Sequence, residues 1–336
     1  MEMRDLVQQK YKEILIHYLQ KQDEQTLYKG QELSRKAIEQ RISPEEIVSL
    51  HVGVLEEIYP DVPEEIRKSF DVLLEVMIGY GFAYREHQSL RHQQLELKTE
   101  IEVAANMQTT LLQTETPNLP GVKVGAKSVP AKQMNGDYYH FAQDENDCLG
   151  VAIADVIGKG MPAALCMSMI KYSMDSLPET RMQPGAVLEN LNRVVEHNVD
   201  PSMFITMLYG IYDPRIHSFF FSSAGHEPGF YYNAKENRFT EISTKGLVLG
   251  VTRTATFEEY RLDLAPGDMI VLLSDGVTEC RAGDQFIERE FIAELIQKNM
   301  DKCPQEIVEG VYDELARLQE FELRDDFTLI ILRRDV

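Results

Sequence analysis

The stretch IADVIGKG at residues 153–160 decides how this sequence is interpreted. It continues a buried strand, because residues 149–154 are small, apolar and partly β-branched. Asp155 then stands where the strand ends, and Gly158 and Gly160 follow it. A turn that begins at the aspartate and leads into a helix explains this pattern on its own. A functional interpretation needs further carboxylates in equivalent places.

Length and composition are typical of a globular protein with two domains. Of the 336 residues, 43% are hydrophobic and 26% are charged. The formal net charge of −21 argues against nucleic acid and anionic membranes as partners, and it is compatible with divalent cations. The apolar runs are too short to span a bilayer, and the charged start lacks the features of a signal peptide. Four scattered cysteines without metal-ligand spacing predict a cytoplasmic protein with reduced thiols.

The first third of the sequence predicts helices only. Apolar residues recur at helical spacing over 4–20, and 31–41 is a second candidate. The residues SPEE at 43–46 form the pattern of a capping box at the start of a third helix. Residues 61–64 repeat this pattern before a fourth helix. We therefore expect a small helical bundle over residues 1–84.

The fourth helix continues in a helix-forming sequence to about Thr114, which gives a helical linker over 85–120. A heptad seam can be drawn along it at Leu90, Gln94, Leu97, Ile101, Ala104, Gln108 and Leu111. The Leu and Ile residues support a coiled coil, whereas the two Gln and the Ala weaken it. Two interpretations stay open: a helix that pairs conditionally with a second copy, and a single solvated connector.

Strands alternate with helices from Gly121 onward. The strand candidates are 122–128, 149–155, 204–212, 218–222, 229–233, 260–264, 269–273 and 327–332, and the helix candidates are 162–176, 184–198, 289–299 and 304–318. Hairpin-like neighbours among the strands predict antiparallel pairing. Paired strands with helices clustered between them predict layered sheets covered by helices.

Further carboxylates lie at the ends of the most apolar strands, as Asp155 does. They are Asp275 after the strand 269–273, Asp137 before the aromatic pair 138–139, and Asp325 and Asp326 before the strand 327–332. Each can be explained separately as a turn former, a helix cap or a solvated strand end. Their shared placement indicates one site.

Carboxylates gathered in this way repel one another and lose hydration unless positive charge lies among them. The basic residues near them in sequence are Lys159, Arg281 and Arg324. A divalent cation would offset the repulsion, and ligands that are all oxygen favour Mg²⁺ or Mn²⁺ over Zn²⁺. A bridging carboxylate such as Asp155 could hold two ions, an arrangement that activates water against a phosphate ester.

Five motifs together resemble those of the metal-dependent protein phosphatases (PPM family), especially the bacterial branch that includes the sporulation phosphatase. They are GD at 136–137, IADVIGKG at 153–160, SSAGHEPG at 222–229, LLSDG at 272–276 and DDFT at 325–328. The resemblance covers residues 121–336 and implies an α+β fold, with two antiparallel sheets flanked by helices. It also implies two Mn²⁺ or Mg²⁺ ions at one edge of the sheets.

The same resemblance implies roles for the motif residues. Asp155 would bridge both metals and the Val156 carbonyl would bind one of them, while Asp275 and Asp325 would hold the second. Asp137 would contribute directly or through water. In catalysis, Asp155 and Asp275 would act through a metal-activated water that attacks phosphorus. The residues expected to shape loops or to stand behind the ligands are Gly136, Gly158, His226, Gly276 and Asp326.

Two positions depart from the eukaryotic pattern of this family. Ile157 stands where those relatives carry a histidine proposed as the general acid. The phosphate-binding arginine upstream of the first motif is missing, with Lys132 nearby. His226 could replace the acid, although Gly225 and Pro228 beside it favour a loop histidine held by backbone bonds.

The order of the parts is similar to that of stress-response phosphatases of Gram-positive bacteria. That similarity implies a serine-phosphorylated anti-anti-sigma factor with a STAS fold as substrate. It also implies that a kinase-like switch protein activates the enzyme by binding the N-terminal, regulatory domain. We expect this binding to pair residues 85–115 in a homodimer, because a weak seam can be switched by a coupling energy of about 1–3 kcal/mol.

Rival interpretations explain less of the sequence. A cysteine phosphatase needs C-x5-R, but the residues six positions after the cysteines are Ala154, Tyr172, Phe286 and Glu309. GKG at 158–160 lacks the rest of a nucleotide-binding loop. A non-catalytic relative that acts as a dimeric scaffold or sensor stays open, although every expected aspartate is present.

Overall fold

The computed structural model describes residues 3–40, 42–158, 160–177, 183–200, 203–242, 244–282 and 285–335, and Lys159 lies outside them. The chain divides into two compact units, Met1–Lys98 and Thr99–Val336. The three-part division predicted above, at residues 84 and 120, stays a prediction. No helix among the described residues is both long enough and apolar enough to cross a membrane.

The first unit is helical, as the sequence predicts. It contains α1 (Met3–Lys21), α2 (Glu24–Glu39), α3 (Pro44–Ile58) and the first part of α4 (Glu64–Leu112). The capping box of α3 is confirmed, since Ser43 N donates to Glu46 Oε2 at 3.0 Å. The predicted start of α2 at residue 31 is wrong. Asp23 accepts a hydrogen bond from Thr26 N at 2.7 Å, and this cap starts the helix at Glu24.

Helix α4 is 49 residues long, and the boundary between the two units falls within it. Three of its predicted seam residues are about half exposed: Leu90 at 52%, Leu97 at 55% and Leu111 at 50%. Gln108 differs from them, because it is only 4% exposed. Pairing of this helix with a second copy stays a prediction.

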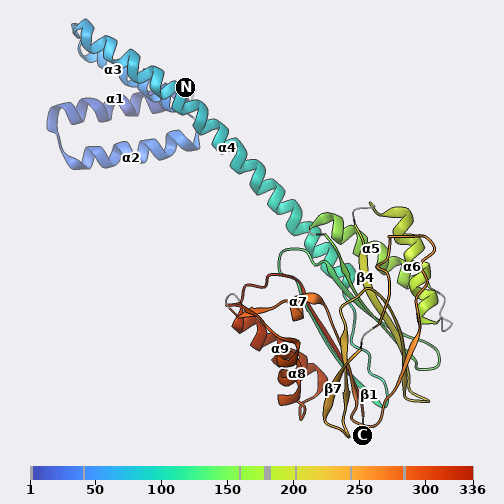
Figure 1. Ribbon diagram of the computed structural model, residues 1–336. Coiled ribbons are helices and arrows are strands. Elements are labelled where there is room, and N and C mark those ends of the chain that lie inside the picture. The colour runs from blue at the N-terminus through green and yellow to red at the C-terminus, as the bar shows by residue number, and fades with distance from the viewer. Residues whose placement is uncertain are drawn as a thin grey trace. The chain divides into compact units, whose positions relative to one another are not determined.

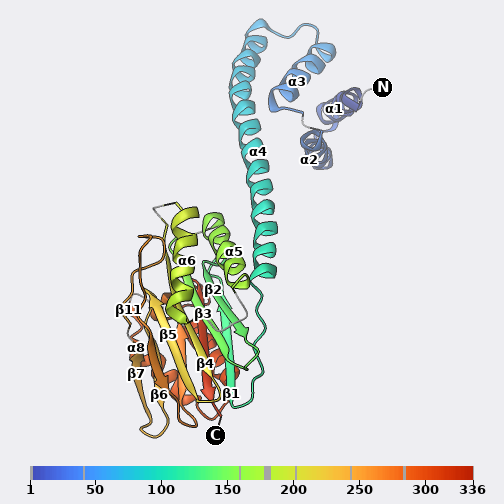
Figure 2. The ribbon, with the colours of Figure 1, turned by 90° about the vertical axis from the view of Figure 1, so that its right-hand side faces the viewer.

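Two five-stranded sheets form the second unit (Figures 1 and 2). In spatial order, the first contains β2 (Asp137–Gln143), β3 (Leu149–Val156), β4 (Ile205–Asp213), β5 (Ser218–Ala224) and β8 (Tyr260–Asp263). The second contains β1 (Val122–Val129), β12 (Phe327–Arg334), β9 (Met269–Leu273), β6 (Gly229–Asn233) and β7 (Arg238–Ile242). All strand pairs recorded among the described residues are antiparallel, so the predicted α+β sandwich is confirmed.

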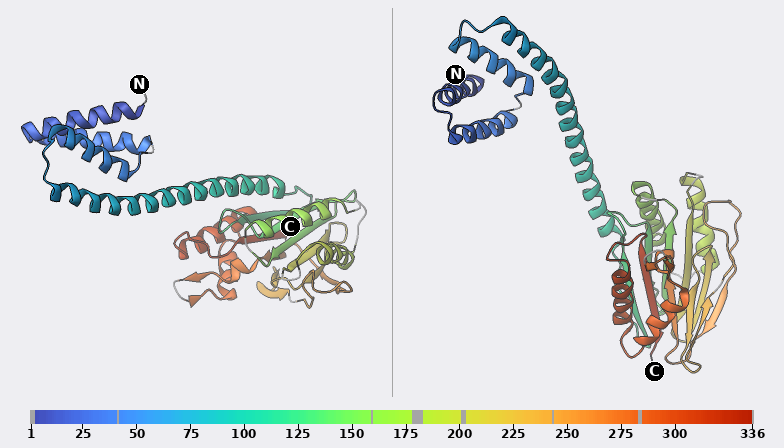
Figure 3. Two further views of the ribbon diagram at one scale, coloured as in Figure 1. Left: turned by 90° about the horizontal axis from the view of Figure 1, so that it is seen from above. Right: turned by 60° about the vertical axis from the view of Figure 1, so that its left-hand side comes forward.

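Helices cover the outer face of each sheet, which gives four layers (Figure 3). Helices α5 (Met161–Asp175) and α6 (Pro184–Asn198) pack on the first sheet, and α8 (Arg289–Lys298) and α9 (Pro304–Leu318) pack on the second. A third apolar core lies between the two sheets and includes Ile153, Leu272 and Ile330. Each sheet is thus buried on both faces, which explains the continuous apolar runs of β3, β9 and β12.

The sequence interpretation missed five short or irregular elements. They are β2, β7, the hairpin of β10 (Arg281–Ala282) and β11 (Gln285–Phe286), and the helix α7 (Asp275–Thr278). β7 is an edge strand with only Ile242 buried, so its apolar pattern is weak. α7 has four residues, too few to show a helical period.

Candidate metal centre

The predicted site residues come from both sheets. Asp137 begins β2 and lies opposite Asp155 of β3 in the strand register. Asp275 begins α7 directly after β9, and Asp325 and Asp326 precede β12, the neighbour of β9. The apolar strands therefore carry these carboxylates to one end of the sandwich.

Gly136 lies between carboxylates of the two sheets. A Cβ atom added there would be 3.2 Å from Asp326 Oδ2 and 3.7 Å from Asp155 Oδ1. Gly136 N donates to Asp326 Oδ2 at 2.5 Å, and its carbonyl accepts from Val156 N at 3.2 Å. A side chain here would enter the space that the carboxylates share, which explains the glycine before Asp137.

The other two predicted glycines also have structural reasons. A Cβ at Gly276 would collide with the carbonyl oxygen of Asp326, so this glycine allows α7 to pack on the segment that carries both aspartates. Gly158 has a φ of 146°, which side-chain-bearing residues rarely adopt. Val156 is buried, and Ile157 beside it is 42% exposed where the eukaryotic relatives carry histidine.

Asp137 is a buried acid with an unsatisfied oxygen. Its side chain is 2% exposed, and its Oδ2 atom has no hydrogen-bond partner. Burial raises the pKa of this carboxyl well above its usual value, and the charges of Asp155 and Asp326 raise it further. Hydrogen bonds from Thr328 and Ser274 oppose this rise only in part. Such a group needs either a proton or a cation.

Asp275 and Asp325 form a second coupled pair. Burial raises the pKa of Asp275 to about 6, and the charges of Asp325 and Glu279 add to the effect. Asp326 instead accepts hydrogen bonds from Ala131 N at 2.7 Å and Gly136 N at 2.5 Å. These two bonds make Asp326 the residue that holds the loop between β1 and β2, while Asp325 Oδ1 accepts from Asp326 N at 3.1 Å.

The donor set fits a hard divalent cation, because carboxylate and carbonyl oxygens are the ligands that Mg²⁺ and Mn²⁺ prefer. Among the described residues, no group of three or more His, Cys, Asp or Glu side chains is arranged as a complete ligand set. The carboxylates interact through their charges in two sets, Asp137 with Asp155 and Asp326, and Asp275 with Asp325, Glu279 and Glu227. Positive charge between these groups would offset the repulsion and satisfy the free oxygen of Asp137.

His226 is held inside the protein next to this site. It is 7% exposed, its Nδ1 lies 2.9 Å from Thr206 Oγ1, and its backbone N donates to Ser223 Oγ at 3.2 Å. Burial lowers the pKa of the ring to about 4, so the imidazole is neutral at pH 7. These contacts support the loop-histidine interpretation, and the depressed pKa disfavours a role as the general acid.

Two charged residues near the site were missed by the sequence interpretation. Arg289 pairs with Glu227 and with the Pro228 carbonyl, and its Nε lies 2.8 Å from Glu241. Glu227 also accepts from Thr278 Oγ1 at 3.1 Å and contributes to the raised pKa of Asp275. The only signal in the sequence was the HEP triplet after Gly225, which does not reveal a partner sixty residues away.

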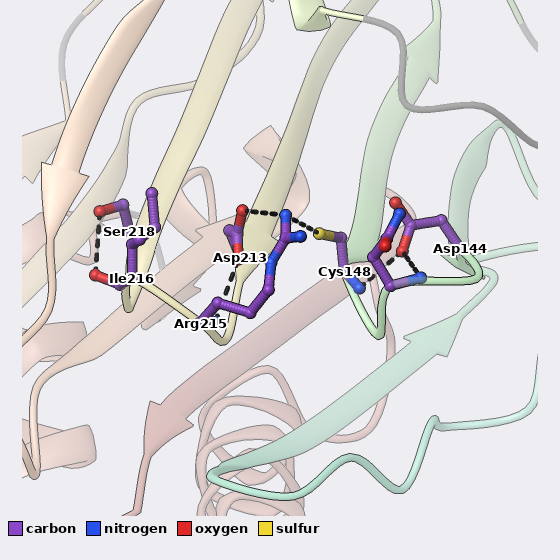
Figure 4. Close-up of polar contacts among 7 residues, drawn as sticks. Asp144, Cys148, Asp213, Arg215, Ile216 and Ser218 are labelled. Atoms are coloured by element: carbon purple, nitrogen blue, oxygen red, sulfur yellow. Dashed lines mark hydrogen bonds and ion pairs between the residues drawn. The ribbon is translucent and has the colours of Figure 1, made fainter.

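A contrasting buried acid lies at the other end of the first sheet (Figure 4). Asp213 is 2% exposed, and its carboxylate accepts from Arg215 Nε at 3.0 Å and from an Arg215 terminal nitrogen at 2.9 Å. Arg215 N adds a third bond at 3.0 Å, and its guanidinium lies 3.9 Å from Cys148 Sγ. Here the chain itself supplies the positive charge, and the hydrogen bond and charge of Asp213 raise the pKa of Arg215.

Family models match both parts of the chain. Residues 145–335 match the model for stage II sporulation protein E (SpoIIE). Residues 9–83 match the N-terminal domain of phosphoserine phosphatase RsbU.

The chain is also similar to a known phosphatase in sequence and to solved phosphatase domains in fold. The phosphoserine phosphatase RsbU of Bacillus subtilis is 56% identical over 336 residues, with 100% of both chains covered. The solved SiaA-PP2C domain of Pseudomonas aeruginosa shares the fold, with a TM-score of 0.61 and 18% identity over 72% of this chain and 99% of that one. The catalytic domain of the serine/threonine phosphatase PstP, solved with two manganese ions, has a TM-score of 0.50 and 14% identity, covering 64% of this chain and 99% of that one.

Proposed function

Because this chain belongs to the SpoIIE and RsbU family of metal-dependent phosphoserine phosphatases, we propose that it acts on a regulatory phosphoprotein in the cytoplasm. The substrate we propose is a serine-phosphorylated anti-anti-sigma factor with a STAS fold, in a bacterial stress-response pathway. The observation that carries the proposal is the buried Asp137, which has an oxygen without a hydrogen-bond partner and a pKa raised by the charges of Asp155 and Asp326.

We propose two cations at the end of the sandwich that carries these aspartates, each held by carboxylates. The residues that would hold them are Asp155, the Val156 carbonyl, Asp275 and Asp325, with Asp137 contributing directly or through water. Divalent cations bound there supply the positive charge that activates water and neutralises phosphoryl oxygens. Asp326 holds the backbone of Ala131 and Gly136, so it fixes the loop that leads to Asp137. The two manganese ions of the PstP domain support the number of ions proposed.

The helical first unit would receive the activating signal. Its match to the RsbU N-terminal domain over residues 9–83 supports a role in binding a kinase-like switch protein. We propose that this binding pairs α4 with a second copy and so activates a homodimer. The uncovered Leu90 and Leu97 are the apolar residues that such pairing would bury.

The first experiment measures phosphate release from a serine-phosphorylated STAS-domain protein in Mn²⁺. Full-length protein is compared alone, with the kinase-like partner, and as Asp155→Asn with the partner. We expect release that requires both Mn²⁺ and Asp155 and that increases with the partner. Mn²⁺ binding without release would mean the wrong substrate or activator, whereas neither binding nor release would favour a non-catalytic scaffold.

The pairing of α4 is tested separately at Gln94, an exposed seam residue. Replacing Gln94 by Leu makes the seam more apolar, so we expect more dimer and a higher basal rate without the partner. Sedimentation and phosphate release are measured on the same samples. A variant that dimerises but keeps the low basal rate would refute activation by pairing.

A further inference from the structure

The last turns of α4 carry an unusual buried amide. Gln108 is 4% exposed, while Met107 and Leu111 beside it are 62% and 50% exposed. Its amide forms two hydrogen bonds with one residue of the second unit: Nε2 donates to Asn135 O at 2.6 Å, and Oε1 accepts from Asn135 N at 3.0 Å. Both polar atoms of this buried amide bond to the backbone of Asn135. The amide is therefore satisfied only while that backbone keeps its position.

Asn135 is the residue before the Gly136-Asp137 motif. Its side chain continues the contact toward the site, since Oδ1 accepts from Asp137 N at 3.0 Å and Nδ2 donates to Ser128 Oγ at 2.8 Å. Ser128 Oγ in turn lies 2.8 Å from Oγ1 of Thr328, which belongs to β12, the strand that follows Asp325 and Asp326. Asn135 is therefore held by α4 on its backbone and by both sheets through its side chain.

We infer that Gln108 is a positioning residue that holds residues 131–137, the metal loop, in the conformation that binds the cation. This inference rests on the proposed metal centre. Without the amide, Asn135 N and O lose their partners in a partly buried place, and the loop can reduce this cost only by moving. Movement of Asn135 displaces Asp137, because Asn135 Oδ1 holds the Asp137 amide. Gln108 thus connects the end of the long helix to the site through two bonded residues.

The contact also changes the interpretation of the heptad seam. Gln108 is one of the two polar seam residues, and in the described chain its amide is engaged within the second unit. A polar residue that weakens a coiled coil is explained here by a different requirement, the binding of the metal loop. Leucine at this position would therefore remove both hydrogen bonds to Asn135, whatever its effect on helix pairing.

The test uses Gln108→Met, which keeps the length of the side chain and its helix propensity but cannot bond to Asn135. Gln93→Met is the matched control, an exposed glutamine of the same helix outside the predicted seam. Mn²⁺ binding is measured by calorimetry on metal-free full-length protein. We expect the dissociation constant to rise about tenfold in Gln108→Met, with no change in Gln93→Met. At saturating Mn²⁺, the turnover of a small aryl phosphate should fall less than the affinity.

Hydrogen exchange provides a readout that does not depend on activity. In the wild type the Asn135 and Asp137 amides should be protected even without metal, and in Gln108→Met both should exchange faster. Unchanged Mn²⁺ affinity and unchanged exchange in a folded Gln108→Met protein would overturn the inference while leaving the metal centre intact. If Gln108→Met does not fold, fast exchange at Asn135 in the wild type would overturn it. Failure of the wild type to bind Mn²⁺ would instead contradict the proposed function.

Discussion

Asp137 and Asp213 are equally buried, yet their surroundings are opposite. Both are 2% exposed and both belong to the first sheet, at opposite ends of it. Asp213 has a guanidinium two residues away, whereas Asp137 has two further carboxylates and a free oxygen. A buried acid whose positive partner comes from the chain serves the fold. A buried acid among other acids reduces the stability of the fold, and an external cation can compensate for it.

The largest expected effect tests the metal end, the end of the sandwich that carries Asp137, Asp155, Asp275 and Asp325. Replacing Asp155 by Asn keeps the size of the side chain but removes the charge that would hold both cations. We expect phosphate release to fall about 10³-fold, since the charge stabilisation that a metal supplies is worth several kcal/mol. Asp213→Asn is the matched control at the other end, and its rate per folded molecule should stay close to that of the wild type. Similar losses in the two variants would remove the distinction between the ends.

The next effect concerns pH. The pKa of His226 is lowered to about 4, so between pH 6.5 and 4 the unfolded chain takes up a proton that the folded chain does not. The contribution of His226 to the free energy of unfolding therefore falls as the pH falls, by about 3 kcal/mol near pH 4. Asp275 has the opposite sign in metal-free protein, because its pKa is raised to about 6 and acid favours its folded form. Comparing urea unfolding of wild type and His226→Gln at each pH isolates the histidine, and parallel curves would contradict this assignment.

Asp137→Asn should separate stability from metal binding. In metal-free protein at pH 7 the buried carboxyl must either take up a proton or stay charged among other carboxylates, and the amide avoids both costs, so we expect the free energy of unfolding to rise by about 1 kcal/mol. The same change should abolish most of the stabilisation that Mn²⁺ gives to the wild type. Thermal unfolding with a chelator and with Mn²⁺ measures both. A variant less stable than wild type in the chelator would show that the carboxylate is satisfied by the protein itself.

The smallest effect should come from Arg215→Met. Loss of the guanidinium removes two charge-assisted hydrogen bonds from the buried Asp213 carboxylate, so the melting temperature should fall. The partial exposure of Arg215 limits the size of this loss. The Mn²⁺ dissociation constant should not change, because this pair lies at the far end of β4. A weakened Mn²⁺ site in this variant would show that the two ends are coupled.

Much of the fold could be predicted because strong local patterns agree with it. The runs 149–156 and 269–273 are buried on both faces, and capping residues start α3 where the sequence indicates. Edge strand β7 and the four-residue α7 could not be predicted, because their positions depend on neighbours distant in the sequence. β2 was missed because DYYHFAQ mixes polar and aromatic residues and is only partly buried.

The candidate site, too, could be predicted from the sequence only in part. The aspartates could be found because strand ends concentrate them next to glycines. Gln108 and Asn135 could not be paired from the sequence, since 27 residues separate them and neither belongs to a motif. The heptad pattern even favoured a different neighbour for Gln108. Glu227 and Arg289, 62 residues apart, illustrate the same difficulty.

The carboxylates of the metal end come from two different sheets, and this has a mechanical consequence. Asp137 and Asp155 belong to the first sheet, whereas Asp275 and Asp325 adjoin strands of the second. An ion shared among them would join the sheets at one end, as a disulfide joins the sheets of other sandwiches. At the opposite end the buried acid, Asp213, pairs with Arg215 of the chain itself. Chelation should therefore loosen this sandwich from one end only, and opening of β2, β3 and β9 should progress away from the aspartates.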